Sequence, residues 1–529
     1  MDEVLSKVKR LSNAKIAAGR TPKEALAYKG VSLWWFIENS IYTDLKKPRE
    51  RKAFGFKIPA AGGTLATKTF LIAKLFVRYV AAILAGRRPR AGGKKIFVSN
   101  SLWHWREIWD SVTLKQRKGD AIIGNVVDWL KREGFDVIGI DRDDGQSVNM
   151  KALIGKMAAD GGMWRPIEAY LTAGIVKNAL EGSSAAEHEW RAIARDGIFK
   201  KLPASFNLFF TYHSFQAIAY FEMARRAMEI EKPQLVLLAG EHSDSGRAMV
   251  AAARLAGVPT IAVQHGFHSH SNVMYFKEQS SRAGLDFVHN TPTADKRAMS
   301  GTWIKSVLIK HFNYPPSEVV VTGQPRYDIL AKANRVFSRK KFCSKFGVDG
   351  KNKIVLIVTQ PFTFGKRELF LRNVLDGLKT TEGISIVIKP HPAENEEWHR
   401  KIAREQAVDT VVLPKSSDTY EALYACDTMI TSSSTTALEA MIMGKSVVIA
   451  DWLNDPWAKP FVNSGSVISV NDKSQLAAAV RKALHDKQIR KRLAPMIKKF
   501  VYEQTYKQDG RATERVVALA KGMIREKGG

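Results

Sequence analysis

The sequence predicts an α/β protein with two Rossmann-like domains that face each other across a cleft. Short runs of apolar and β-branched residues recur along the chain, and most of them end in polar residues. Helical segments separate these runs, which is the alternation that a parallel sheet with crossover helices requires. A basic, polar stretch at 335–352 divides the runs into two groups. We therefore expect two parallel sheets joined by a linker, with ligands at the carboxyl ends of their strands.

The segment 384–451 shows this alternation most clearly. An apolar run ends at Lys389-Pro390-His391-Pro392, and further along the chain a second strand meets a turn rich in hydroxyl groups. A helix begins directly after that turn, so its unpaired N–H groups and its dipole favour an anion there. The elements follow in the order strand (429–430), hydroxyl-rich turn (431–436), helix (437–443), Gly444 as its end, and strand (446–450).

The same pattern divides the whole chain into four parts. We expect a helical N-terminal segment (1–94), a first Rossmann-like domain (95–335), a second Rossmann-like domain (336–472) and C-terminal helices (473–529). The predicted strands of the first domain are 94–101, 135–141, 234–241, 259–266, 286–290 and 318–325, and the second domain adds 353–361 and 467–470 to those above.

Composition indicates a globular protein with an anionic partner. Of the 529 residues, 45% are hydrophobic and 25% are charged, which is ordinary for folded domains. Cys343 and Cys426 cannot form a disulfide framework, and the N-terminus lacks the apolar core of a secretion signal, so we expect a cytoplasmic protein. The net charge of +30 favours a membrane surface or a phosphorylated substrate. The basic residues are spread along the chain without a basic arm, which disfavours nucleic acid. The oligomeric state stays open.

One long helix, within residues 66–90, has an apolar half and a polar half. Lys74 and Arg78 interrupt its apolar run, so it does not fit a membrane-spanning helix. It fits an amphipathic helix in the membrane interface, and we expect peripheral association with the anionic inner face of the plasma membrane. The alternative is a helix packed on the protein's own core. The apolar half holds Phe70, Ile72, Phe76, Val77, Tyr79, Val80, Ile83 and Leu84, the polar half Thr67, Lys68, Lys74 and Arg78, and Arg87, Arg88, Arg90, Lys94 and Lys95 follow.

Several common site motifs are absent or incomplete. Neither predicted domain carries G-x-G-x-x-G or a P-loop, so a dehydrogenase or a P-loop kinase is disfavoured. His265-x-x-His268-x-His270 lacks a nearby carboxylate or cysteine that would complete a zinc site. Asp141-Arg142-Asp143 precedes Asp-Gly and reads more simply as a turn than as a metal-binding D-x-D. We therefore expect no metal.

Several motifs together resemble a known group of two-domain enzymes. They are Lys389-Pro390-His391-Pro392, the SSSTTALEAMIMGKSVVI segment, TGQPRYD at 322–328 and the stretch 241–266 that ends in His-Gly. The set, which covers residues 230–470, resembles glycosyltransferases of the B-type fold. Within these it is most similar to surface- or capsular-polysaccharide enzymes and to CDP-glycerol glycerophosphotransferase-like enzymes. Gln264 stands where that last group has a Trp before its His-Gly pair.

The resemblance implies metal-independent transfer of a sugar or polyol phosphate from a nucleotide-activated donor to a glycan or lipid-linked acceptor. The donor would bind the second domain and the acceptor the first, without a further cofactor. By this resemblance His391 contacts the donor diphosphate, Glu439 contacts the ribose hydroxyls, and His265 is the general base. The other residues expected at the donor are Lys389, Ser433, Ser434, Thr435 and Thr436.

The residues also support this chemistry by themselves, and they leave alternatives open. A leaving diphosphate needs cationic side chains or a helix N-terminus, and a strand-end histidine offers a base with a pKa near neutrality. Glu241 competes as the base or supports it, and Arg326 binds phosphate or pairs with Asp328. Each residue also has an ordinary structural reading: residues 432–436 can cap the following helix, and His265 can be a core histidine.

Two other functions remain open at this point. A nucleotide-sugar epimerase of the same fold would use the same diphosphate site and would need no membrane helix. A noncatalytic membrane- or nucleic-acid-binding protein on a degenerate fold would need neither a base nor a nucleotide. Nucleotide binding separates both enzymes from this last reading.

Overall fold

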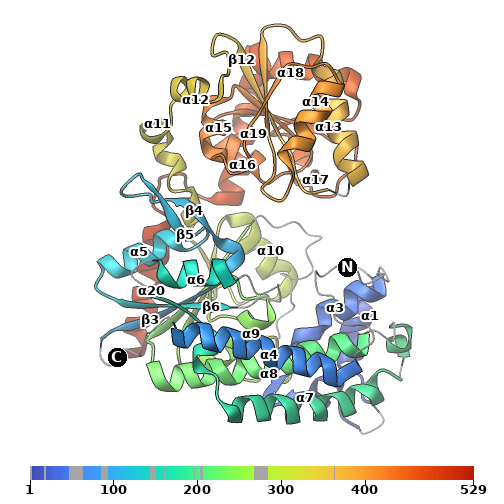
Figure 1. Ribbon diagram of the computed structural model, residues 1–529, viewed down its shortest axis with the longest axis vertical. Coiled ribbons are helices and arrows are strands. Elements are labelled where there is room, and N and C mark those ends of the chain that lie inside the picture. Colours follow the sequence, from blue (N-terminus) through green and yellow to red (C-terminus); the bar gives the residue numbers. More distant parts are fainter. Residues whose placement is uncertain are drawn as a thin grey trace.

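The computed structural model describes residues 3–16, 19–46, 63–84, 93–142, 150–159, 163–195, 197–202, 206–266, 284–362 and 364–528. Within these residues the chain forms two parallel sheets with helices packed on them, one above the other in Figure 1. We call the parts of the chain built around these sheets the first domain and the second domain. The boundaries predicted at 94, 335 and 472 stay predictions.

The first sheet has seven parallel strands in the order β11-β10-β9-β8-β3-β6-β7. Every residue of β3 is buried because helices cover both faces of the sheet; Ile96–Val98 are apolar, and the polar residues Ser99–Ser101 lie at the carboxyl end of the strand. The strand order reverses between β3 and β8, the point at which ligands of such sheets bind. The strands are β3 (Lys95–Ser101), β6 (Asp136–Arg142), β7 (Trp164–Pro166), β8 (Leu235–Ala239), β9 (Thr260–Val263), β10 (Lys296–Met299) and β11 (Val319–Val321).

The second sheet has six parallel strands in the order β14-β13-β12-β15-β16-β17. Numbered by their own appearance in the chain, these strands run 3-2-1-4-5-6, the order of a Rossmann fold, with the reversal between β12 and β15. The strands are β12 (Lys353–Val358), β13 (Ile384–Lys389), β14 (Thr410–Val412), β15 (Thr428–Thr431), β16 (Ser446–Ala450) and β17 (Ile468–Val470).

Helices pack on the sheets and enclose two large apolar cores in each domain. Ahead of the first sheet and within it lie α1 (Glu3–Ser12), α2 (Pro22–Ala25), α3 (Trp34–Lys46), α4 (Gly63–Leu84), α5 (Gly124–Arg132), α6 (Met150–Ala158), α7 (Ala173–Ile193), α8 (Phe206–Glu231), α9 (Asp244–Leu255) and α10 (Thr302–Phe312). The rest are α11 (Ala333–Val336), α12 (Arg339–Phe346), α13 (Phe364–Leu378), α14 (Glu396–Glu405), α15 (Thr419–Ala425), α16 (Thr436–Ile442), α17 (Lys459–Asn463), α18 (Leu476–His485), α19 (Lys487–Thr505) and α20 (Ala512–Gly528).

Two segments join the domains away from the linker. β4 (Trp105–Trp109) and β5 (Gln116–Asp120) form an antiparallel hairpin, and Trp109 packs against the core of the second domain. The indole N–H of Trp109 donates to the carboxylate of Asp418. In the other direction α20, at the end of the chain, returns to the first domain and packs in the core beside β3 (Figure 1). The two domains therefore contact each other through segments far apart in sequence.

Most predicted strands are confirmed, but two predictions about this part of the chain are wrong. Residues 286–290 contribute only an isolated bridge between Val31 and Phe287, and the neighbouring strand of the sheet is β10. The sequence of β10, KRAM, has no apolar run that could have marked it. The stretch at 335–352 is not only a linker, because Ser338 caps α12 and Phe342 and Cys343 of that helix enter the core of the second domain.

The long helix predicted within 66–90 is confirmed as α4, but its orientation reverses the usual one. The side chains of its polar half, including Lys68, Lys74 and Arg78, are buried against the protein. Much of its apolar half is exposed, with 58% of both Phe76 and Ile83 accessible. Among the described residues, no helix is both long enough and apolar enough to cross a membrane. Arg87, Arg88 and Arg90 lie outside the described residues.

Candidate active site at the domain junction

Side chains of both domains meet near the carboxyl ends of the two sheets. We call this region the junction; it contains Arg106 of β4, His265 after β9, Arg326 after β11, His391 after β13 and Glu439 of α16. Arg326 Nη2 and Glu439 Oε1 form an ion pair at 3.2 Å. The charge of Arg106 acts on both His391 and Glu439. Four of these five residues were predicted from the sequence, and the structure brings them together.

The ion pair between Arg326 and Glu439 is a direct contact between the two domains at the junction. Glu439 is buried and the Arg326 side chain is 16% exposed; Arg326 Nη2 also donates to the hydroxyl of Tyr327 at 2.7 Å. Burial raises the pKa of Glu439, while Arg326 and then Arg106 act against that rise. Burial opposes the charge of Arg326, but Tyr327 and Glu439 outweigh it and raise the pKa of the guanidinium. The alternative pairing of Arg326 with Asp328 is wrong, because Asp328 accepts two backbone N–H groups at the start of α20.

Ser433 lies at the reversal point of the second sheet and is held from both sides. Gln360, just beyond β12, donates from Nε2 to Ser433 Oγ at 2.6 Å, and Ser433 N donates to Gln360 Oε1 at 3.1 Å. Ser433 Oγ in turn donates to Asp455 Oδ2 at 2.5 Å. This network fixes the turn that follows β15, so the hydroxyl of Ser433 already has protein partners on both sides.

The next three hydroxyl residues lie at the start of α16. Ser434 Oγ accepts the N–H of Thr436 at 3.3 Å and donates to its hydroxyl at 3.0 Å, so Ser434 bonds to the first residue of α16. Thr435 is exposed at the start of the helix. The helix ends at Ile442, and Gly444 follows with a positive φ of 72°, a conformation that favours glycine. The N-cap residue of α16 is Thr435, which makes no side-chain capping hydrogen bond, and contact of Ser434, Thr435 and Thr436 with a phosphate stays a prediction.

His391 lies at the end of β13 in a half-buried turn. Its Nδ1 accepts the N–H of Ala393 at 3.1 Å, so in the neutral ring the proton is on Nε2. Burial lowers its pKa; Glu394 acts against this, while Lys389 and Arg106 lower the pKa further. A neutral ring with an Nε2–H group can donate a hydrogen bond to a phosphate oxygen.

Lys389 is the first residue of the motif Lys389-Pro390-His391-Pro392. Its side chain is buried and bonds to the backbone of the turn instead of facing solvent. Its ammonium donates to the carbonyl oxygens of Pro390 at 3.0 Å and Lys415 at 2.9 Å. Burial lowers its pKa to about 8, against the opposing charges of Asp418 and Glu396. A direct contact between Lys389 and the nucleotide-activated donor stays a prediction. The hydrogen bonds described here give Lys389 a structural role in the turn.

His265 follows β9 in the first domain and is largely enclosed. Its ring stacks on that of His104, with centroids 5.7 Å apart and an angle of 28° between the planes. Burial first, and then the charges of His104 and Arg326, lower the pKa of His265 to about 4. The prediction of a base with a pKa near neutrality is therefore wrong in its value. The ring is neutral at neutral pH, and a neutral imidazole can accept a proton.

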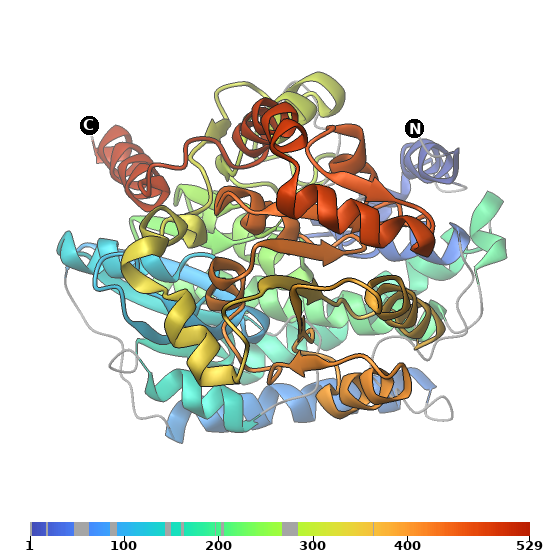
Figure 2. The ribbon, with the colours of Figure 1, turned by 90° about the horizontal axis from the view of Figure 1, so that it is seen from above.

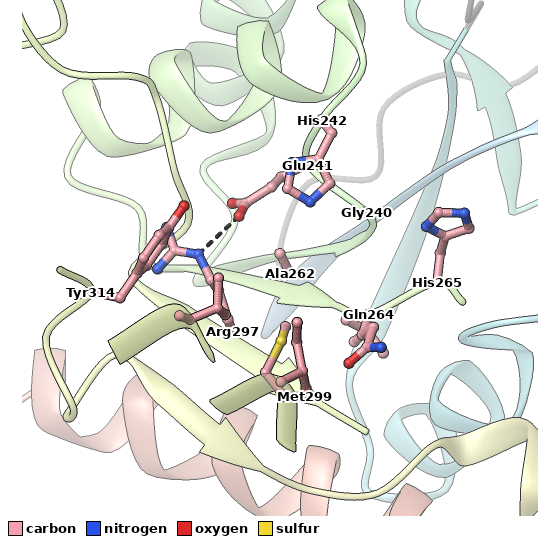
Figure 3. A pocket seen from close by; sticks show the side chains of 12 residues that line it. Gly240, Glu241, His242, Ala262, Gln264, His265, Arg297, Met299 and Tyr314 are labelled. Atoms are coloured by element: carbon pink, nitrogen blue, oxygen red, sulfur yellow. Dashed lines mark hydrogen bonds and ion pairs between the residues drawn. The ribbon is translucent and has the colours of Figure 1, made fainter. Parts of the chain in front are cut away.

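Glu241, the alternative base, is turned away from His265. Its carboxylate accepts Arg297 Nε at 2.9 Å and the N–H of Ala294 at 2.5 Å, and the side chain is 2% exposed. In Figure 3 it points toward Arg297, and His265 lies on the other side of the view. A cavity of about 30 Å³ beside these residues has room for little more than a water molecule. We therefore correct the prediction: Glu241 is a buried, ion-paired carboxylate that supports the fold.

Arg106 of the junction, and His104 beside His265, were missed in the sequence. His104 ends the turn η1 (Leu102–His104) after β3, and Arg106 follows in the hairpin. Arg106 is exposed, and the described residues show no hydrogen bond or ion pair of its guanidinium. The signal was present, because the stretch SLWHWREIW begins at the carboxyl end of the first strand, where the strand-end rule places ligands.

The candidate metal sites of the sequence have other partners or lie outside the described residues. Asp141 is buried at the end of β6 and pairs with Lys156 Nζ at 2.5 Å and Arg78 Nη2 at 3.0 Å. Asp143, His268 and His270 are not among the described residues. Within the part of the chain that the structure describes, no three His, Cys, Asp or Glu side chains are grouped as metal ligands.

Comparison with known proteins decides the family. A family model described as UDP-N-acetylglucosamine 2-epimerase matches residues 213–521, which is more than half of the chain. The chain belongs to the UDP-N-acetylglucosamine 2-epimerase family. The match includes His265, Arg326, His391 and Glu439, so the junction falls largely within the family's own region. No curated protein sequence matches this member of the family.

Solved structures agree on the fold. The UDP-GlcNAc 2-epimerase from Neisseria meningitidis bound to UDP-GlcNAc is 14% identical; the match covers 81% of this chain and 100% of that one, with a TM-score of 0.51. Another UDP-N-acetylglucosamine 2-epimerase is 14% identical over 82% of this chain and 96% of its own, also with a TM-score of 0.51. The wall teichoic acid polymerase TagF is 12% identical over 87% of this chain and 97% of its own, but its TM-score of 0.47 is too low to support an argument.

These findings correct the functional prediction. The expected glycosyltransferase-like architecture of parallel α/β sheets is confirmed, but the specific family is an epimerase family and the transferase reading is wrong. The alternative kept open from the sequence, a nucleotide-sugar epimerase, is the one that the family match supports. The error has a physical cause: a diphosphate site at the strand ends is common to both activities, so the motifs that indicate it cannot separate them.

Proposed function

We propose that this protein is a nucleotide-sugar epimerase that inverts carbon 2 of a UDP-linked N-acetylhexosamine, with UDP-GlcNAc as the first substrate to test. The observation that carries the proposal is the family match over 213–521. An epimerase needs no acceptor. The glycan or lipid-linked acceptor that the predicted transferase required is therefore no longer part of the proposal. The only partners that the reaction requires are the nucleotide sugar and water.

The junction supplies groups suited to a diphosphate. Arg106 is exposed there, and His391 offers an Nε2–H donor on the opposite domain. Arg326 adds a second cationic side chain, although Glu439 balances part of its charge. We assign the diphosphate to Arg106 and His391, because charge-assisted hydrogen bonds to phosphate are the strong ones. The exposed hydroxyl of Thr435 and that of Thr436 then lie at the same strand-end edge as His391.

When the carbon-2 C–H bond breaks, its electron pair forms a double bond to carbon 1 and expels UDP; re-addition of UDP, with a proton added to the opposite face of carbon 2, gives the 2-epimer. Inversion therefore begins with removal of the carbon-2 proton. His265 is our candidate for the group that accepts it. The ring is neutral at neutral pH because burial lowers its pKa to about 4, and His104 stacks beside it. A neutral imidazole can accept the proton removed from carbon 2.

Deuterium exchange at carbon 2 tests the proposal directly. The purified protein is incubated with UDP-GlcNAc in D₂O, and the sugar signals are followed by proton NMR. We expect loss of the proton signal at carbon 2 together with the appearance of the 2-epimer. The exchange should depend on enzyme concentration, because the solvent alone does not remove this proton.

Two further measurements make the result decisive. UDP binding is measured by calorimetry on the same sample, and His289→Ala is run in parallel because His289 is an exposed histidine away from the junction. Exchange that persists in His289→Ala supports the proposal. A protein that binds UDP but shows neither exchange nor the 2-epimer is not a 2-epimerase of this substrate, and the proposed activity would then be rejected.

We also propose that the enzyme works at the cytoplasmic face of a membrane, as a peripheral protein. The support for this location is independent of the junction and comes from the exposed apolar face of α4.

A further inference from the structure

Helix α4 is amphipathic, but the face that it packs against the protein carries its charged residues, and much of its apolar face is exposed. Its exposed face carries Leu65 (77% exposed), Phe76 (58%), Ile83 (58%) and Leu84 (81%). The buried face contains the cations Lys68, Lys74 and Arg78 as well as apolar side chains. A surface helix normally buries its apolar stripe and turns its charges to water. The sequence of α4 therefore suits an environment in which its outer face is not in water.

Buried ion pairs hold the helix in this orientation. Arg78 Nη2 lies 3.0 Å from Asp141 Oδ2, and Arg78 Nε lies 2.9 Å from Glu168 Oε1. Nearer the start of the helix, Lys68 Nζ lies 2.9 Å from Glu187 Oε1. Rotating α4 to bury its apolar face would leave these acids buried without their partners, which is strongly unfavourable. The apolar face is thus fixed outward by the fold.

Helix α6 extends the same apolar surface. A groove of about 530 Å³ runs between α4 and α6, and nearly all of its lining is apolar. Ile154 of α6 is 53% exposed at this groove, and Phe76 and Leu84 of α4 lie along it. In Figures 1 and 2 the two helices lie side by side at the outer edge of the first domain. Together they form one surface, which we call the α4–α6 face.

Charge decides what covers this face. The protein has a net charge of +30, so a second copy is repelled and an acidic surface is attracted. The sequence on either side of α4 is basic as well: 46–57 holds six Lys or Arg and one Glu, and 85–95 holds five Lys or Arg and no acid. Apolar side chains framed by cations are the composition of a helix that lies in an anionic bilayer interface.

We propose that the α4–α6 face docks on an acidic phospholipid bilayer, with the exposed side chains of α4 and α6 inserted among the acyl chains. The protein would bind the bilayer without crossing it. Docking rests on residues outside the junction, so the proposal stands whether or not the enzyme is a 2-epimerase. Docking would also explain the orientation of α4, which leaves apolar side chains exposed to water in the free protein.

Vesicle co-sedimentation of the full-length protein tests the proposal. The vesicles are phosphatidylcholine with about one third phosphatidylglycerol, and phosphatidylcholine alone serves as the uncharged comparison. We expect the wild-type protein to bind the acidic vesicles and Phe76→Asp/Ile83→Asp to bind them at least tenfold more weakly, because apolar insertion is lost. Ile154→Asp should weaken binding to a smaller extent. High salt should release the wild-type protein only in part, since charge is screened but apolar burial is not.

The control carries the same charge change on another part of the surface. Leu369→Asp/Tyr502→Asp alters two residues of the second domain that are 49% and 45% exposed, and it should bind vesicles like the wild type. UDP affinity and the circular dichroism spectrum of every variant should be unchanged, because none of these residues lies at the junction. Equal vesicle binding by the α4 variant and the control overturns the proposal. So does a stable dimer, seen by sedimentation velocity, that Phe76→Asp/Ile83→Asp dissociates.

Discussion

The two strand-end histidines of the junction look alike in sequence but differ in their surroundings. His265 follows β9 in the first domain, where enclosure and the stacked ring of His104 lower its pKa to about 4. His391 follows β13 in the second domain, where it stays half-buried and its Nδ1 accepts the N–H of Ala393. One histidine is therefore kept neutral in an enclosed site, and the other is oriented by its own turn.

This difference separates two tasks. A histidine that removes a proton from substrate carbon must be neutral to accept it, and the lowered pKa of His265 meets this requirement. A histidine that holds a diphosphate must present an N–H group in a fixed direction, which describes His391. We propose that the two histidines have different functions, so removing either one should produce a different defect.

The largest effect should come from His265→Ala. If His265 carries the proton, its loss should lower turnover by roughly 10²- to 10⁴-fold, the usual share of general acid–base catalysis. UDP affinity should stay within about twofold, because the diphosphate contacts that we assign lie elsewhere. Turnover by the deuterium-exchange assay and affinity by calorimetry give the two numbers. His391→Ala is the matched comparison, and it should weaken UDP binding as well as turnover.

A second outcome would reverse this assignment. Wild-type turnover in His265→Ala, together with normal UDP affinity, would place the proton acceptor on another group. His104 would be tested next, because its ring is the immediate neighbour of His265.

The next largest effect concerns stability and pH. The folded pKa of His265 lies near 4, below the value of about 6.5 expected in the unfolded chain. Between these values the unfolded chain binds a proton that the folded protein does not, so the free energy of unfolding falls as the pH decreases. At pH 5 the loss from this one group should be roughly 2 kcal/mol relative to pH 7.

His265→Gln isolates that contribution. Urea unfolding of the wild type and the variant at pH 7 and pH 5 gives the four free energies that are needed. The variant should lose less stability than the wild type, because glutamine does not titrate. An equal loss in both proteins would mean that other groups cause the acid sensitivity and that His265 is not shielded as described.

Much of the fold could be predicted because buried parallel strands leave a strong local signal. β12 and β16 are apolar after their first residue, β3 contains the apolar run Ile96–Val98, and each strand was placed within a few residues. β10 was missed because its four residues, KRAM, gain their burial from neighbouring strands rather than from their own composition. The orientation of α4 could not be predicted either, since the buried acids that hold its cations lie far away in the sequence.

The site divides in the same way. His391 and the turn from Ser433 to Thr436 follow strands directly, so the strand-end rule located them. The same rule chose Glu241, but its partner Arg297 lies on β10, the strand that sequence reading had missed. The pairing of Arg326 with Glu439 joins residues that sequence spacing cannot connect. Composition therefore located the edge of the sheet, and only the fold revealed which side chains already had partners there.

The smallest effect should come from Arg106→Gln, and it tests whether the first domain contributes anything to the diphosphate. Arg106 is exposed on the hairpin, so its replacement should leave thermal unfolding unchanged. If it contacts the diphosphate, the Kd for UDP should rise about tenfold, which corresponds to roughly 1.4 kcal/mol. The increase should shrink at high salt, because exposed charges are screened.

Lys118→Gln is the matched control, since Lys118 lies on the same hairpin, is 61% exposed and pairs with Glu107. Calorimetry at low and high salt compares the two variants. Equal affinity in both at low salt would leave diphosphate binding to the second domain alone, and the division of tasks between the two strand ends would then be complete.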